Sequence, residues 1–126
     1  MIGDPKRKPY RNKKILDAAR DEPCLVNLPG CTGGGPDTVA AHSNQFDDGK
    51  GGSQKADDCF VAFACQSCHD ILDGRKEGYS LISVMREIGK SKAERDNRMT
   101  KTEIQWFHDR GIKRTIRRLL DKGVLK

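Results

Sequence analysis

Four cysteines in two pairs constrain the fold of this chain more than any other feature. Cys24 and Cys31 precede a short apolar run at 38–42, and Cys65 and Cys68 follow a second one. Tetrahedral zinc accepts four thiolates at ~2.3 Å and closes a structural site. Such a site would clamp the chain before one strand to the chain after the next. The spacing therefore predicts a four-cysteine zinc knuckle.

Other interpretations of the cysteines stay open. Cys65 and Cys68 also have the spacing of a thioredoxin-like redox pair, although the βαβ pattern that such a pair requires is absent. Together with His69 they match the C-x-x-C-H haem-attachment pattern, which normally accompanies export. Unliganded, buried thiols are the remaining alternative. The fifth cysteine, Cys59, lies in an apolar run, where we expect a small buried hydrophobe.

A metal would compensate for a small apolar core. The chain has 126 residues, which suits one domain with modest extensions, and only 35% of them are hydrophobic. Its 13 glycines and its charged fraction of 33% are typical of small chains that depend on a metal or on crosslinks. No apolar stretch follows the charged N-terminus, so we expect no signal peptide, no membrane span and a reducing cytoplasm.

Charge is distributed unevenly along the chain. Residues 1–14 carry six Lys/Arg against one Asp, residues 15–85 carry five against eleven acids, and residues 86–126 carry thirteen against six. Basic flanks can hold a polyanion while central carboxylates hold a cation that meets a phosphate. A solvated surface with uneven charge is the alternative.

The apolar pattern predicts the order strand, loop, strand, helix at the centre of the chain. A helix is expected at 12–20, followed by strands at 38–42 and 59–64 that a loop at 43–57 joins. A helix then starts at 69–73, and a helical segment follows at 79–88. A Thr100–Glu103 capping box opens the next helix, and a last helix runs over 112–123 after a break at Gly111. The fold class is therefore α+β. We divide the chain into a disordered basic arm at 1–14, a core at 15–78 and a basic helical extension at 79–126 packed on that core.

Two of the three histidines stand at the ends of these elements. His42 ends the first strand and His69 opens the helix. If the knuckle draws those ends together, the two imidazoles converge on one pocket. Phosphodiester hydrolysis needs a base that activates water and a cation that neutralises developing charge. A neutral imidazole near pH 7 suits the first task.

Polar residues near the histidines form a candidate metal site. Asp73 lies four residues after His69, so both side chains can chelate one ion from a helix face. Asn44 would share a side with His42 if the strand continues, and Asp58 could hydrogen-bond His42 and fix its tautomer. A solvated helix face and a turn-forming Asp are the alternatives.

The residues resemble the HNH-superfamily nucleases of lambda-like phages and prophages. The resemblance rests on Ala41-His42-Ser43-Asn44-Gln45, Gly49-Lys50-Gly51, Lys55-Ala56, Asp58, Val61-Ala62-Phe63-Ala64-Cys65, Cys68-His69 and Asp73-Gly74, and extends through Gly111, Arg114-Thr115 and Gly123. It implies a small ββα-metal (HNH) core. It also implies that His42 is the general base, that His69 and Asp73 bind the catalytic metal, and that Asp58 takes the place of the central Asn.

One position departs from the wider superfamily. Many members place an acidic metal ligand directly before the first histidine, where this chain has Ala41. Asn44 is a candidate substitute ligand.

We therefore expect an HNH endonuclease that hydrolyses DNA phosphodiester bonds in the cytoplasm of a bacterial host. Its expected cofactors are structural Zn²⁺ and a catalytic Mg²⁺ or other divalent ion. The residues expected to contact nucleic acid are Lys50, Lys55, Arg114, Arg117 and Arg118, with a solvated helix face as the alternative for the arginines. A non-catalytic zinc-knuckle factor that binds nucleic acid or protein in phage recombination or replication is the alternative function, and a haem carrier is a third.

Overall fold

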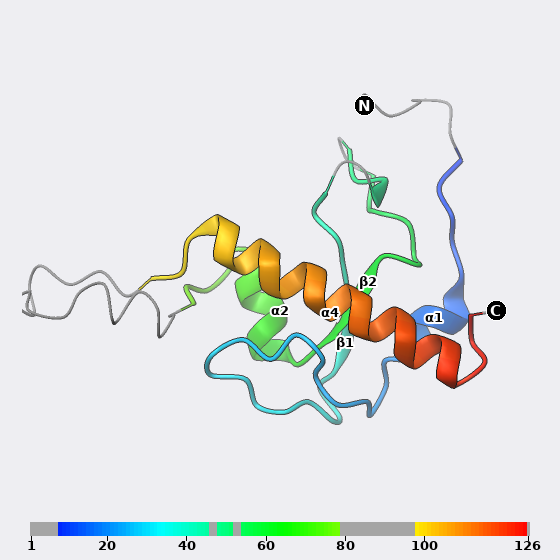
Figure 1. The fold of residues 1–126 in the computed structure, drawn as a ribbon, viewed down its shortest axis with the longest axis horizontal. Coiled ribbons are helices and arrows are strands. Elements are labelled where there is room, and N and C mark those ends of the chain that lie inside the picture. The colour runs from blue at the N-terminus through cyan, green and yellow to red at the C-terminus, as the bar shows by residue number, and fades with distance from the viewer. Residues whose placement is uncertain (1–7, 46–47, 52–53, 79–97, 126) are drawn as a thin grey trace, which may run out of the picture.

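The computed structural model describes residues 8–45, 48–51, 54–78 and 98–125. The helical segment expected at 79–88 lies outside these residues. The described elements are α1 (Lys13–Asp17), β1 (Val39–His42), β2 (Val61–Ala64), α2 (Gln66–Leu72) and α4 (Lys101–Asp121). In Figure 1, α4 crosses in front of the two strands, with α2 near its first half and α1 near its second. The fold is a small α+β arrangement in which helices surround a two-stranded sheet.

The two strands pair antiparallel, with Val39 opposite Ala64 and His42 opposite Val61. The outer edge of β2 is covered by other segments. Leu25 donates its backbone N–H to Phe63 O at 2.8 Å, and Phe63 donates its own N–H to Thr115 Oγ1 at 2.9 Å. The cysteine-bearing loop and α4 therefore both bond the outer edge of β2 at Phe63.

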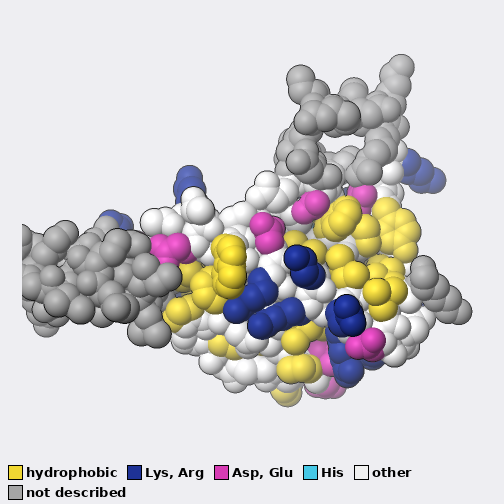
Figure 2. All heavy atoms as spheres, viewed as in Figure 1, with side chains coloured by type: hydrophobic (Ala, Val, Ile, Leu, Met, Phe, Trp, Pro, Cys, Tyr) yellow, Lys and Arg dark blue, Asp and Glu magenta, His cyan; other side chains and the backbone are white. Residues whose placement is uncertain are grey.

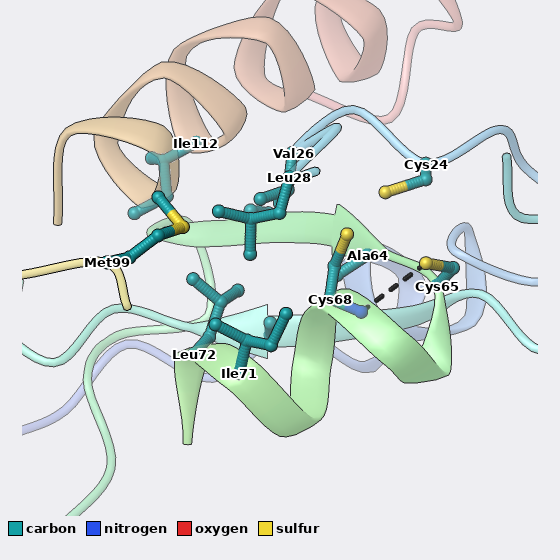
Figure 3. Close-up of a cluster of buried hydrophobic side chains, with 12 residues drawn as sticks. Cys24, Val26, Leu28, Ala64, Cys65, Cys68, Ile71, Leu72, Met99 and Ile112 are labelled. Atoms are coloured by element: carbon teal, nitrogen blue, oxygen red, sulfur yellow. Dashed lines mark hydrogen bonds between the residues drawn. The ribbon is translucent and has the colours of Figure 1, made fainter. Parts of the chain in front are cut away.

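Alternate residues of β2 serve two separate apolar clusters. Ala62 and Ala64 belong to a cluster that includes Val26, Leu72 and Ile112, shown in Figure 3. Val61 and Phe63 belong to a second cluster with Ile15, Ala19 and Leu119. All four strand residues are buried because one face packs on the cysteine loop, α2 and α4, while the other packs on α1 and the end of α4.

A capping box opens α4, as predicted. Thr100 accepts from Glu103 N–H at 3.1 Å, and the Glu103 carboxylate accepts from Thr100 N–H at 3.2 Å. The predicted break at Gly111 is wrong, because the helix continues to Asp121. A Cβ at Gly111 would lie 2.8 Å from Val26 Cγ2 and 3.1 Å from Ala62 Cβ. The glycine therefore allows close packing instead of ending the helix.

Two further boundaries differ from the prediction. Helix α2 begins at Gln66, three residues before His69, because Cys65 caps it and accepts from Cys68 N–H at 3.4 Å. Helix α1 is capped by Asn12 as expected but ends at Asp17.

Of the basic arm expected at 1–14, residues 8–14 lie within the described part of the chain, and two of them contact the loop before β2. Tyr10 N–H donates to Asp57 Oδ1 at 3.2 Å, and Arg11 Nη1 donates to Ala56 O at 2.7 Å. These contacts fix the segment against the loop before β2. Among the described residues, no helix has the length and apolar character needed to cross a membrane.

Candidate active site and metal centre

The four predicted zinc ligands lie together. The Sγ atoms of Cys24, Cys31, Cys65 and Cys68 are all within 4.8 Å of one another, and those of Cys31 and Cys65 are 3.8 Å apart. Four sulfurs at ~2.3 Å from a tetrahedral zinc would be about 3.8 Å apart. In Figure 3 the side chains of Cys24, Cys65 and Cys68 converge. The cluster could therefore hold a metal ion and is compatible with structural zinc.

Backbone amides point at the sulfurs. Asn27 N–H donates to Cys24 Sγ at 3.5 Å, and Gly33 N–H donates to Cys31 Sγ at 3.2 Å. A hydrogen bond from Cys68 lowers the pKa of Cys24 to about 4 and raises the pKa of Cys68 itself. The two sulfurs therefore lie within hydrogen-bonding distance of each other, as ligands of one ion would.

The two predicted catalytic histidines line one cavity of about 650 Å³. His42 reaches it from the end of β1, and His69 reaches it from α2. The other predicted site residues in its wall are Asn44, Lys50, Lys55 and Asp73. Residues far apart in sequence are brought together because β1 and α2 pack against each other.

Asp58 hydrogen-bonds His42. Its Oδ1 lies 2.9 Å from His42 Nε2, and its Oδ2 accepts the Asn12 N–H at 2.7 Å. Burial raises the pKa of Asp58, but the hydrogen bonds from His42 and Asn12 outweigh that effect and leave the pKa below its usual value. The carboxylate is therefore ionised near pH 7 and can only accept, so Nε2 carries the proton. This leaves Nδ1 as the ring nitrogen able to accept a proton.

His69 and Asp73 form the second cluster in the cavity wall. His69 Nε2 lies 3.1 Å from Asp73 Oδ2. Neighbouring ligands of an octahedral ion at ~2.1 Å would be about 3.0 Å apart, so the pair fits a divalent cation as two of its ligands.

Arg75 was not singled out by the sequence. Its Nη2 lies 2.9 Å from Asp73 Oδ2 and 3.4 Å from His69 Nδ1. Gly74, with φ of +76°, turns the chain so that Arg75 folds back over the helix end. A Gly directly after a candidate ligand is the only sequence signal that could have indicated this arrangement.

Asn44 lines the cavity although β1 ends at His42. Its Nδ2 donates to Leu72 O at 3.2 Å, which leaves the side-chain amide oxygen as the atom that could bind a cation. Ala41, at the position of the missing acidic ligand, is buried and belongs to the apolar cluster.

The chain is similar in sequence to a nuclease family and in fold to a solved structure. The family described as "Putative nuclease YbcO" matches residues 13–103. The chain belongs to this family. The "Putative nuclease YbcO" of Escherichia coli K12 and its counterpart in Enterobacteria phage 82 are each 28% identical to it over 99 residues, covering 79% of this chain and 96% of the relative. A solved "putative bacteriophage protein" from E. coli K-12 MG1655 has a TM-score of 0.53 and 26% identity, covering 86% of this chain and 98% of that one.

The region matched by the YbcO family includes the four cysteines and the residues of the cavity, but it stops at Glu103. The three arginines predicted to hold nucleic acid lie beyond it, on α4, and none lines the cavity. Arg118 bonds the buried Glu22, with Nε 3.2 Å from Oε1, and Arg114 Nη1 donates to Leu25 O at 3.4 Å. The structure thus separates the α4 arginines from the lysines of the cavity.

Proposed function

We propose that this chain is a metal-dependent endonuclease of the HNH type that hydrolyses DNA phosphodiester bonds and is encoded by a phage or prophage. The observation that carries the proposal is the shared cavity of His42, His69 and Asp73. Membership of a family described as nucleases supports the reaction class, and the relative in phage 82 supports the origin.

In this proposal His42 is the general base. With Nε2 bonded to Asp58, the Nδ1 lone pair takes a proton from water as the water attacks phosphorus. Asp58 then stabilises the imidazolium that forms, because its carboxylate lies 2.9 Å from the ring. Asp58 is therefore a positioning residue that acts through His42.

His69 and Asp73 would hold the catalytic divalent ion, with Asn44 as an additional oxygen donor. When bound, such an ion neutralises charge on the phosphate and on the leaving oxygen. Lys50 and Lys55, also in the cavity wall, would bind the flanking phosphates of the polyanion. The four cysteines would hold structural zinc and keep β1 and α2 in place.

A plasmid-nicking assay with Mg²⁺, Mn²⁺ or Ni²⁺ tests this function. The protein should convert supercoiled plasmid to open circles only when a divalent ion is added. His42→Ala should slow nicking about 10²- to 10⁴-fold, the usual contribution of a general base. A His42→Ala variant that is folded and cuts as fast as the parent would exclude His42 as the base.

Asp73→Ala has a matched control in Asp70→Ala. Both acids lie at the end of α2 and pair with Arg75, but only Asp73 lines the cavity. Asp73→Ala should raise the metal concentration needed for half-maximal nicking, and Asp70→Ala should leave it unchanged. If the chain is instead a non-catalytic zinc-knuckle factor, it will bind DNA without nicking it under any of the three metals.

A further inference from the structure

The outward side of α4 carries an aromatic and basic stripe that the cavity does not use. Its members are Trp106, Arg110, Lys113, Arg114 and Arg117. Their spacing makes them project from one side of the helix. Asp109 borders this stripe, because it projects about 60° around the helix from Trp106 and about 40° from Lys113, on the side away from Arg114. Figure 2 shows Lys and Arg side chains gathered over α4, with no histidine visible on this face. The stripe is therefore a positive surface separate from the histidine-lined cavity.

Trp106 is the most exposed of the large apolar side chains that the structure describes, at 58%. It does not pack into either apolar cluster, although a tryptophan buries a large area where it can. The capping box of Thr100 and Glu103 already stabilises the start of α4, so Trp106 is not needed to cap the helix. Its ring meets that of Phe107 edge to face, with centroids 5.2 Å apart, and still leaves more than half of the side chain open to solvent.

Arg110 is held beside this ring. Its guanidinium carbon lies 4.9 Å from the Trp106 ring centroid and 4.8 Å from that of Phe107. Its Nη2 also donates to Val26 O at 3.0 Å, so the side chain is fixed before any ligand arrives. A stacked arginine next to an exposed indole combines a cation for phosphate with a flat surface for a base.

We propose that this stripe binds a single-stranded segment of DNA, with a base stacked on Trp106 and phosphates along Arg110, Lys113, Arg114 and Arg117. Charge complementarity with a polyanion selects a nucleic acid, and the exposed indole selects unpaired bases, because bases inside a duplex keep their faces covered. The inference rests on the proposed function only in taking DNA as the nucleic acid. Arg118 is excluded from the surface because Glu22 holds it.

Trp106 makes the test direct because it is the only tryptophan in the chain. The His42→Ala protein, without added divalent metal, keeps the DNA intact while a thymidine oligonucleotide of about 20 nucleotides is added. We expect quenching of the tryptophan emission, with affinity that falls as salt rises. Heparin, a polyanion without bases, should quench much less.

Substitutions then separate stacking from charge. Anisotropy of the labelled oligonucleotide should show about fivefold or weaker binding for Trp106→Ala and near-parental binding for Trp106→Phe. Lys101→Ala is the matched control, because it removes a charge from the same helix about 140° around from Trp106. It should change affinity by less than about twofold.

Three results would overturn the inference. They are oligonucleotide binding by anisotropy with unchanged tryptophan emission, equal quenching by heparin, and a Trp106-dependent dimer in sedimentation, which would mean that a second copy covers the stripe. Nicking by the chain with both His42 and Trp106 intact separates the two proposals. Nicking by a protein whose tryptophan emission DNA does not quench contradicts only the stripe, and quenching without nicking contradicts only the nuclease.

Discussion

Gly111→Ala sets two physical effects against each other in the middle of α4. Helix propensity alone favours alanine over an interior glycine by about 1 kcal/mol. Packing opposes the change, since the added Cβ would lie 2.8 Å from Val26 Cγ2, 3.1 Å from Ala62 Cβ and 3.3 Å from Val26 Cα. Val26 and Ala62 are fully buried, so neither can swing away.

Overpacking of this kind destabilises by about 1–3 kcal/mol, and three simultaneous contacts place Gly111→Ala toward the upper end. After the propensity gain is subtracted, we expect the free energy of unfolding to fall by about 1–2 kcal/mol. For a domain of this size that corresponds to a Tm lower by about 3–8 °C. Differential scanning calorimetry of the zinc-loaded protein measures it.

A double-mutant cycle with Val26→Ala identifies the cause. Val26→Ala alone should destabilise, because it leaves a small cavity at a fully buried position. Combined with Gly111→Ala, the new methyl group occupies part of that cavity, so the double variant should lose less than the sum of the two single losses. If Gly111→Ala raises Tm, or if the two losses add, close packing at Gly111 is not what the glycine provides.

Three further predictions concern the site and its supports. Asp58→Asn should slow nicking about 10- to 100-fold, the usual effect of losing a carboxylate that orients a histidine, and should also lower Tm, because the hydrogen bonds from His42 and Asn12 hold the pKa of Asp58 below its usual value. Cys68→Ser should abolish stoichiometric zinc in metal analysis and lower Tm, because metal binding contributes directly to folding. Burial raises the pKa of Glu22, but hydrogen bonds from Lys122 and Arg118 leave it below the usual 4.5. The stability that this carboxylate provides is therefore present above pH 4.5 and lost as pH falls below it, so Glu22→Gln should be less stable than the parent at pH 6 and closer to it at pH 3 in calorimetry.

The sequence correctly predicted those elements that depend on residues close together in the chain. The Thr100 capping box, the Asn12 cap and the two short strands depend on neighbours in sequence, and the structure confirms them. The cysteine cluster is confirmed as well, since the four Sγ atoms lie within 4.8 Å of one another.

Errors arose where the cause lies far away in sequence. Judged from its neighbours in sequence, Gly111 predicts a helix break. What requires a glycine there is the close approach of Val26, which lies 85 positions earlier. The contacts of the basic N-terminal segment are equally distant in sequence, since Asp57 accepts from Tyr10 N–H and Asp58 accepts from Asn12 N–H. Sequence spacing cannot identify these partners, because nothing within either segment encodes them.

The sheet that carries His42 is too small to hold its geometry alone. Two paired strands of four residues are marginal in water without further packing. At one end, Val39 pairs with Ala64, the residue directly before Cys65 of the cysteine cluster. At the other, His42 is held by Asp58, whose second oxygen is held by Asn12.

A third support comes from α4. Burial lowers the pKa of His108, so its ring is neutral, and its Nε2 donates to Ala41 O at 3.3 Å, one residue before His42. The position of the proposed base therefore depends on the cysteine cluster, a carboxylate and a buried imidazole from separate parts of the sequence. It follows that removal of the proposed zinc should slow plasmid nicking at temperatures where the chain is still folded, because the cysteine cluster supports β1 through the pairing of Val39 with Ala64, next to Cys65.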